Sequence, residues 1–401
     1  MNCRVCDSQN LDLVIDLGLQ PWCNNFLKKE DVGSEPYYPL RVLFCNDCFT
    51  TQLDYTVTKE IMFGDHTYLS GVTKSLSAHF EKIAIEADKM FCKDITDKTV
   101  LDIGSNDGTQ LQHFKKLGYN VIGVESSKTT AKMANDAGVY TINEYFNHEL
   151  VQNYNLNNKI DLINAAGVFF HLEELHSVTK GIKSALKEDG VFIVQFLYMK
   201  NIVENNAFDQ IYHEHLLYYT LKTIETLLNR HDLSMFDAYV DEIHGGSVVG
   251  YISHKNKKIP TERLTQLRED EDILKMNEKD TYLLFNERIK QMKIDNIAFL
   301  QNAKNNNKII YGMGAPVKGN TMLNYFGIGT DYIDYLVEKN QLRKGLYSPG
   351  MHIPIVMEDE IKEFPDIYYV FAWNFKKEIL ANNKNLIESG VEFYFPVNPN
   401  N

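Results

Sequence analysis

The sequence predicts an α/β protein in which a small metal-binding module precedes two units of alternating strands and helices. Two Cys-x-x-Cys pairs near the amino terminus, Cys3–Cys6 and Cys45–Cys48, indicate the module. An apolar, β-favouring run at residues 99–103 breaks at a glycine turn and resumes as an amphipathic helical pattern. The same order recurs at residues 307–321, so a second α/β unit is expected near the carboxyl end.

Length and composition exclude several classes of protein. A chain of 401 residues predicts two or three domains, and 44% hydrophobic with 24% charged residues is ordinary for a globular protein. The net charge of -13 argues against a general nucleic-acid binder, because phosphate neutralisation needs a basic surface. No apolar run approaches the roughly 18 residues that span a membrane, and the chain starts without a secretory pattern. We therefore expect a cytoplasmic protein without a membrane partner.

Four of the six cysteines have the spacing of a zinc site. Cys3, Cys6, Cys45 and Cys48 form two knuckles that can close a tetrahedral thiolate shell around Zn²⁺. The alternatives are four unrelated buried thiols or a redox Cys-x-x-Cys, and the first pair lacks the preceding βα pattern of a redox motif. Because the protein fills all four positions, the predicted zinc is structural. Between the knuckles, residues 17–21 are expected to form a loop over the module.

The turn after residues 99–103 has the composition of a cofactor site. Gly104 and Gly108 let the backbone approach a ligand at the carboxyl end of the first strand of a sheet. There is no GxGxxG, and Asp102 and Asp107 disfavour a pyrophosphate, so a cofactor with a cationic centre fits better. Glu125 ends the next predicted strand, where a carboxylate can accept two ribose hydroxyls.

These features resemble motif I and the acidic strand-two residue of class I S-adenosylmethionine (SAM)-dependent methyltransferases. A Rossmann-like turn that binds another adenosine compound is the alternative. Further strands are predicted at residues 138–144, 160–167 and 186–196, in the βα alternation of a methyltransferase core. The candidate cofactor-binding residues lie in the turn and near the ends of these strands: Asp102, Gly104, Asn106, Gly108, Glu125, Ser126, Asn143 and Asn164.

Residues 208–219 contain the densest cluster of titratable side chains. Tyr212, Glu214 and His215, together with His213, can supply a general base, an orienting carboxylate and a hydroxyl donor. A catalytic metal is the alternative, although the HEH order lacks the HExxH spacing that places two imidazoles on one helix face.

Two further histidines have more than one interpretation. His171 follows the fourth predicted strand, at the edge where such sheets carry out chemistry, but a core histidine is the alternative. His244 precedes two glycines and can either reach a substrate or cap a turn. The second glycine turn, at residues 312–319, can bind an anion with Lys318 as a point charge, or it can be purely structural.

The order of these features resembles the three-domain sugar C-methyltransferases that act on nucleotide-linked keto-deoxysugars. The resemblance covers essentially the whole chain through the paired Cys-x-x-Cys, LDIGSNDGTQL, IYHEHLLYYT, HGGS and GMGAPVKGNTMLNY. It implies a zinc-binding module, a class I methyltransferase domain that is Rossmann-like, and a second Rossmann-like domain. The expected boundaries are 1–70, 71–255 and 256–401. Two positions depart from the family pattern, because Ser126 replaces a proline and Trp22-Cys23 is bulkier than usual.

The resemblance also implies roles for individual residues. His215 would be the base with Glu214 beside it, while Tyr68, His171 and Tyr212 would line the pocket around the sugar ketone. Gly104, Asn106 and Glu125 would hold SAM. Lys318 and Asn320, in the carboxyl-terminal turn, would help to bind the nucleotide diphosphate.

The sequence therefore predicts a SAM-dependent C-methyltransferase that acts on carbon 3 of a nucleotide-linked 4-keto-6-deoxysugar through an enolate. An imidazole of ordinary pKa, roughly 6.5, deprotonates such a carbon only when the enolate oxygen is stabilised. An O- or N-methyltransferase of the same fold is the first alternative, and a zinc-knuckle binding protein with a vestigial methyltransferase domain is the second. The expected substrate is a small nucleotide-diphosphate sugar. We expect a monomer, because large separate domains of one chain can surround a single cleft.

Overall fold

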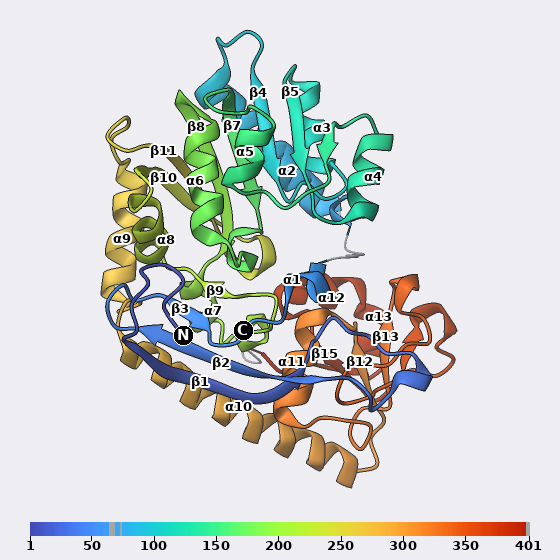
Figure 1. Ribbon diagram of the computed structural model, residues 1–401. Helices are drawn as coiled ribbons and strands as arrows, with labels where there is room; N and C mark the ends of the chain where they lie inside the picture. The colour runs from blue at the N-terminus through green and yellow to red at the C-terminus, as the bar shows by residue number, and fades with distance from the viewer. Residues whose placement is uncertain (64–68, 73, 398–401) are drawn as a thin grey trace.

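The computed structural model describes residues 1–63, 69–72 and 74–397, and these residues form three sheets (Figure 1). A four-stranded sheet lies at the amino-terminal end, a seven-stranded sheet forms the middle of the chain, and a five-stranded sheet forms the carboxyl-terminal part. The α/β architecture predicted from the sequence is confirmed. Within the described ranges, no helix is both long and apolar enough to cross a membrane.

The first sheet has the order β1-β2-β3-β9. Its strands are β1 (Leu11–Pro21), β2 (Tyr37–Cys45), β3 (Thr51–Leu53) and β9 (Leu217–Tyr218). The loop predicted at residues 17–21 is wrong, because β1 continues through Pro21, which pairs with Tyr37. Gly18, at a φ of +76°, allows an irregularity between Asp16 and Leu19, and the antiparallel pairing resumes after it.

The middle sheet has the order β10-β11-β8-β7-β4-β5-β6, with β10 and β11 antiparallel to their neighbours and the others parallel. Its strands are β4 (Thr99–Ile103), β5 (Asn120–Val124), β6 (Thr141–Ile142), β7 (Ile160–Ala166), β8 (Leu186–Leu197), β10 (Leu233–Asp241) and β11 (Ser247–His254). The order reverses between β4 and β7, and such a switch point is where open α/β sheets bind ligands. The predicted βα alternation is confirmed.

Helices accompany the first two sheets. They are α1 (Lys59–Phe63), α2 (Lys74–Ala87), α3 (Thr109–Lys116), α4 (Lys128–Asp136), α5 (His148–Asn153), α6 (Leu175–Ala185), α7 (Met199–Glu204) and α8 (Leu221–Asn229). Helix α2 comes before β4 along the chain. A π-helical turn at Asp88–Cys92 then leads toward β4.

The carboxyl-terminal sheet is parallel and has the order β14-β13-β12-β15-β16, with its switch point between β12 and β15. Its strands are β12 (Ile310–Met313), β13 (Tyr335–Glu338), β14 (Ile355–Met357), β15 (Ile367–Val370) and β16 (Glu392–Tyr394). Helices α9 (Glu262–Ile273) and α10 (Lys279–Asn305) connect it to the middle sheet. Its remaining helices are α11 (Val317–Phe326), α12 (Lys376–Asn382) and α13 (Lys384–Glu388).

The three sheets are joined into one body. Strand β9 comes from the middle of the chain, yet it pairs with β3 of the amino-terminal sheet. Helix α10 contacts β1 and runs beneath the amino-terminal sheet in Figure 1. A buried carboxylate, Glu35, accepts hydrogen bonds from Gly350 N at 2.9 Å and His352 Nε2 at 2.6 Å. One apolar core cluster includes residues of all three sheets, so the loops between them have defined relative positions.

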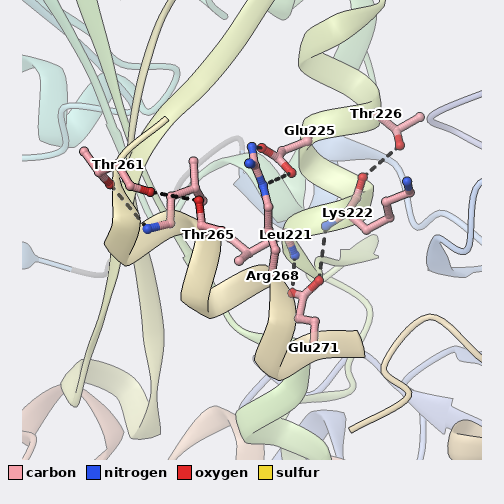
Figure 2. A network of polar contacts seen from close by, with 9 residues as sticks. Leu221, Lys222, Glu225, Thr226, Thr261, Thr265, Arg268 and Glu271 are labelled. Carbon is pink, nitrogen blue, oxygen red and sulfur yellow. Dashed lines mark hydrogen bonds and ion pairs between the residues drawn. The ribbon is translucent and has the colours of Figure 1, made fainter. Parts of the chain in front are cut away.

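A polar network fixes α9 against α8 (Figure 2). The Glu271 carboxylate accepts the backbone N–H groups of Leu221 and Lys222, which begin α8. An anion at this end of a helix is favourable because the first N–H groups lack partners within the helix. Arg268 and Glu225 form an ion pair one turn away.

We expect Glu271 to make stability depend on pH. Burial raises the pKa of Glu271 to about 7, although the hydrogen bonds that it accepts favour the charged form and lower the pKa. The folded state therefore binds this proton more tightly than the unfolded state, and the contribution to stability rises as pH falls from about 7 toward 4.5. Between pH 7.5 and 5.5, the free energy of urea-induced unfolding of the wild type should gain about 2 kcal/mol relative to Glu271→Gln. Parallel pH profiles for the two proteins would contradict this assignment.

Candidate active site and metal centre

The four predicted zinc ligands come together in the amino-terminal sheet. The sulfur atoms of Cys3, Cys6, Cys45 and Cys48 all lie within 4.8 Å of one another. The Cys3–Cys48 and Cys6–Cys45 sulfur pairs are 3.5 and 3.6 Å apart, too far for disulfides. Zn–S bonds of about 2.3 Å give a tetrahedron with edges of roughly 3.8 Å, so the cluster fits a zinc ion.

Both knuckles have the same backbone turn. Asp7 N donates to Cys3 O at 3.0 Å, and Phe49 N donates to Cys45 O at 2.8 Å. The residue after each second cysteine has a positive φ, 66° at Asp7 and 67° at Phe49. Because the protein supplies all four ligands, the site leaves no open coordination position for chemistry, as expected of a structural metal.

The predicted cofactor turn lies at the switch point of the middle sheet. Gly104 has a φ of +70°, and a Cβ atom there would lie 2.7 Å from Val168 Cγ2, so the turn requires glycine. The Glu125 carboxylate accepts the backbone N–H of Asn106 at 2.9 Å and of Ser127 at 2.7 Å. These bonds hold the carboxylate beside the turn. Burial nevertheless raises the pKa of Glu125.

Two polar side chains in or just after the same turn have buried atoms without partners among the described residues. Within the described part of the chain, neither Ser105 Oγ nor Gln110 Nε2 has a hydrogen-bond partner, although both atoms are buried. A pocket beside them is lined by Ser70, Phe80, Asp102, Gly104, Ser105, Gln110 and Ala166. Buried polar atoms without partners are costly, and a polar cofactor in this pocket would satisfy them. The residues present therefore fit a bound nucleoside cofactor such as SAM.

The other predicted cofactor residues surround the turn in different ways. Asp102, on β4, accepts a hydrogen bond from Asn164 Nδ2 of β7 at 2.6 Å, and burial raises its pKa to about 7. Asn143 Nδ2 donates to the carbonyls of Glu125 at 2.8 Å and Ser126 at 3.0 Å, so it braces the loop after β5. Gly108 precedes α3 with a φ of +79°.

His215 has the geometry of a neutral base. The residues just before His215 form a turn, and His215 Nδ1 lies 2.7 Å from the carbonyl oxygen of Gln210. A carbonyl only accepts, so Nδ1 carries the proton and the lone pair is on Nε2. Burial, together with the nearby His171, holds the pKa of His215 well below its usual range. The imidazole is therefore uncharged at neutral pH.

Aromatic and imidazole rings enclose this base. The ring centroid of His215 lies 3.8 Å from Tyr212, 4.6 Å from Phe170 and 5.2 Å from His171. His171 follows β7, and its Nδ1 lies 2.5 Å from the carbonyl oxygen of Glu214. Burial raises the pKa of Tyr212 well above its usual value, so its hydroxyl remains a hydrogen-bond donor. The structure thus brings His171, Tyr212 and His215 together, while Tyr68 lies outside the described residues.

The side chains of Glu214 and His213, which precede His215 in the chain, have partners in the amino-terminal part of the protein. The Glu214 carboxylate accepts the indole N–H of Trp22 at 2.8 Å, and burial raises its pKa. The atom that orients His215 is therefore the Gln210 carbonyl, not the neighbouring carboxylate. His213 faces the amino-terminal sheet, where its ring lies 5.7 Å from Tyr38.

The three predicted substrate-binding residues lie at the junction with the carboxyl-terminal sheet. His244 is an exposed residue with a φ of 57°, and its carbonyl accepts Gln210 Nε2 at 3.3 Å. Lys318 Nζ lies 3.4 Å from Asp209 Oδ2 and 4.6 Å from the centroid of the Trp373 ring. Asn320 is buried and donates to the carbonyl of Cys23 at 2.7 Å, so it holds the loop after β1.

Sequence reasoning missed four residues around the base. Gln210 and Asp209 lie within residues 208–219, but Gln210 acts through its backbone and Asp209 makes its contacts across domains. Trp22 and Trp373 contact Glu214 and Asp209 from opposite ends of the chain. Trp22 was noted only as part of the bulky Trp22-Cys23 pair, and the one sequence signal of Trp373 is that the chain has two tryptophans in all.

The fold and the site define a SAM-dependent methyltransferase that carries a zinc-binding module. Three family models match successive parts of the chain. They describe a zinc binding domain at residues 3–63, a methyltransferase domain at residues 77–237 and a C-methyltransferase C-terminal domain at residues 242–398.

A characterised relative identifies the family. C-methyltransferase NovU of Streptomyces niveus is 30% identical over 406 residues, which cover 98% of this chain and 95% of NovU. The chain therefore belongs to the C-methyltransferase family that includes NovU, and it is a SAM-dependent C-methyltransferase.

Solved structures are similar to part of the chain. A protein of Pyrococcus horikoshii OT3 has 17% sequence identity and a TM-score of 0.39, covering 47% of this chain and 95% of that one. Magnesium protoporphyrin IX methyltransferase from Synechocystis has 13% identity and a TM-score of 0.34, covering 44% of this chain and 79% of that one.

Proposed function

We propose that this enzyme methylates carbon 3 of a nucleotide-linked 4-keto-6-deoxysugar through an enolate, with His215 as the base. The main support for the proposal is the hydrogen bond of the His215 ring, in which Nδ1–H donates to the Gln210 carbonyl at 2.7 Å. The lone pair of Nε2 is therefore available to take a proton. Methylation at carbon requires a carbanion, and a carbon beside a ketone supplies one as the enolate.

The depressed pKa of His215 makes help at the enolate oxygen necessary. A neutral imidazole cannot hold a proton taken from carbon unless hydrogen bonds stabilise the developing negative charge. Such bonds are worth about 3 to 4 kcal/mol each when they are preorganised. Tyr212, whose raised pKa keeps its hydroxyl protonated, is suited to donate one of them, and His171 lies beside the same ring. Tyr68 is proposed as a further donor from its place in the sequence.

The cofactor and the substrate are proposed to bind to different sets of residues. SAM, when bound, supplies an electrophilic methyl group that the enolate carbon takes up. We propose that its site is formed or braced by the turn after β4 and the residues around it: Asp102, Gly104, Asn106, Gly108, Glu125, Ser126, Asn143 and Asn164. His244, Lys318 and Asn320 are proposed for the nucleotide-diphosphate sugar. The first two contact Gln210 and Asp209, just before the base, and Asn320 holds the loop after β1 through the Cys23 carbonyl.

We assign residues 1–70 to the zinc module, 71–255 to the SAM domain and 256–401 to the carboxyl-terminal domain. The proposed site takes most of its residues from the second and third of these domains and Tyr68 from the end of the first, and Trp22 of the first contacts Glu214. We propose a monomer as the active unit, because one junction between the domains of a single chain can hold both ligands.

Glu125→Gln should weaken SAM binding. The buried carboxylate is held by two backbone N–H groups, and its remaining lone pairs would accept ribose hydroxyls. Hydrogen bonds to a charged group are worth about 1.5 to 3 kcal/mol, so the dissociation constant should rise roughly tenfold or more. Calorimetric titration with SAM measures this. The matched control is Asp136→Asn, which removes an exposed carboxylate of α4 that pairs with Lys132. Equal affinity for both variants would contradict the role of Glu125.

The reaction itself can be tested with a dTDP-4-keto-6-deoxyhexose in deuterated water, with and without SAM. We expect deuterium uptake next to the ketone and, with SAM, the gain of one methyl group on carbon, both followed by mass spectrometry. Failure with this sugar alone would point to another sugar or nucleotide. Failure across a panel of keto-sugars, with methylation of a reduced sugar instead, would support O- or N-methylation and exclude His215 as the base that forms an enolate.

A further inference from the structure

We propose that Trp22 and Trp373 are positioning residues that hold the base loop, residues 208–215, from the two outer domains. The proposal rests on the proposed role of His215 as the base. Each tryptophan donates its indole N–H to a carboxylate of this loop, and these are the two tryptophans of the whole chain.

Trp22 holds the carboxyl-terminal end of the loop. Its Nε1 donates to Glu214 Oε1 at 2.8 Å, and Glu214 immediately precedes His215. The backbone of Glu214 is also bound, because its carbonyl lies 2.5 Å from His171 Nδ1. The loop after β1 that carries Trp22 is itself fixed by Asn320 of α11, which donates to the Cys23 carbonyl. Movement of Trp22 would therefore displace the residue next to the base.

Trp373 holds the amino-terminal end of the loop. It follows β15 at the switch point of the carboxyl-terminal sheet, and its Nε1 donates to Asp209 Oδ2 at 2.9 Å. Asp209 is fully buried, and the next residue, Gln210, supplies the carbonyl that orients His215. Among the described residues, Asp209 Oδ1 has no hydrogen-bond partner. The indole N–H and Lys318 are thus the donors that hold this buried carboxylate.

Trp373 also supports the loop that carries His244. A Cβ atom at Gly245 would lie only 2.8 Å from Cη2 of Trp373, so the indole edge packs directly against the glycine backbone. Gly245 has a φ of +88°, which further favours glycine there. The face of the same ring lies under Lys318 Nζ. One side chain therefore contacts the base loop, the His244 loop and the proposed diphosphate-binding lysine.

The physical consequence of losing either indole N–H is a misplaced base. A buried carboxylate that loses its donor moves toward water or another partner, because an unsatisfied buried acceptor is costly. Displacing a catalytic group by 1 Å can cost about 100-fold in rate. Phenylalanine keeps much of the ring packing and removes only the donor, so Trp22→Phe and Trp373→Phe isolate the hydrogen bonds.

The test measures deuterium exchange into the keto-sugar, kcat and KM for methyl transfer, and SAM affinity in both variants. We expect exchange and kcat to fall about tenfold, with SAM affinity within twofold of the wild type. The matched control is Tyr119→Phe, which removes a hydroxyl that donates to Asp88 at 3.0 Å near the opposite, amino-terminal edge of the sheet. The control should keep wild-type exchange. Full exchange in both tryptophan variants would overturn the proposal.

Two additional measurements separate positioning from general loosening and from failure of the proposed function. In Glu214→Gln and Asp209→Asn backgrounds, the matching tryptophan change should have a smaller effect than in the wild type, because each pair acts as a unit. Strict additivity would overturn the proposal. Nitrogen NMR of the His215 ring, identified by its loss in His215→Asn, needs no substrate. We expect one protonated Nδ1 signal in the wild type and mixed tautomers in Trp373→Phe, whereas an unchanged signal would overturn the role of Trp373.

Discussion

The His215→Asn enzyme should lose solvent exchange at the acidic carbon of the sugar and, with it, methyl transfer. Asparagine keeps an N–H group that can donate to the Gln210 carbonyl, which the wild-type ring contacts at 2.7 Å, so the loop should hold its shape. The substitution removes the basic Nε2. A positioned general base contributes about 10²- to 10⁴-fold to rate, and we expect both exchange and kcat to fall by that factor.

The measurement is deuterium uptake followed by mass spectrometry, first without SAM and then with it. SAM affinity and thermal stability serve as controls, and both should stay close to the wild type because no proposed cofactor residue changes. Near-normal exchange would show that the base is Tyr212, Glu214 or another group. Loss of methyl transfer with intact exchange would show that His215 acts in a step after proton abstraction.

Cys45→Ser should destabilise the protein far more than it alters its chemistry. Cys45 ends β2 and belongs to the cluster of four sulfurs that fits zinc. A structural zinc site contributes about 10 to 16 kcal/mol in small zinc-binding peptides, and a hydroxyl is a poor substitute for a thiolate ligand. Strand β9, just after the base loop, pairs with β3 in the same sheet, so loss of zinc should also disturb that loop. We expect a much lower melting temperature and yield.

Zinc content per chain and thermal unfolding check this prediction. The matched control is Cys92→Ser, which also replaces a buried thiol by a hydroxyl but lies outside the cluster. The control should keep one zinc per chain, whereas Cys45→Ser should keep little. Any Cys45→Ser protein that stays folded should bind SAM normally. Full zinc content in Cys45→Ser would show that the other three thiols and a different ligand suffice.

The sequence alone determined those elements that depend on interactions between residues close together in the chain. The four cysteines predict a zinc cluster because each knuckle is a tight turn that brings two thiols together within four residues. The glycine turn after β4 and strand β5, which ends one residue before Glu125, were also predicted. Hydrophobic periodicity indicates the strands, and glycine indicates a turn that needs a positive φ. The loop predicted at residues 17–21 failed because pairing with β2 overrides the glycine signal.

Only the tertiary structure decided how the base is held. The sequence identified His215 within IYHEH, but the hydrogen-bond partner of His215 is a backbone carbonyl. Every residue has such a carbonyl, so no residue type indicates which one is the partner. Strand β9 is two residues long and exists only because β3 offers it an edge. Trp22 and Glu214 are 192 positions apart, and Trp373 and Asp209 are 164 apart. Such contacts follow from the packing of whole sheets, and no periodicity along the chain encodes them.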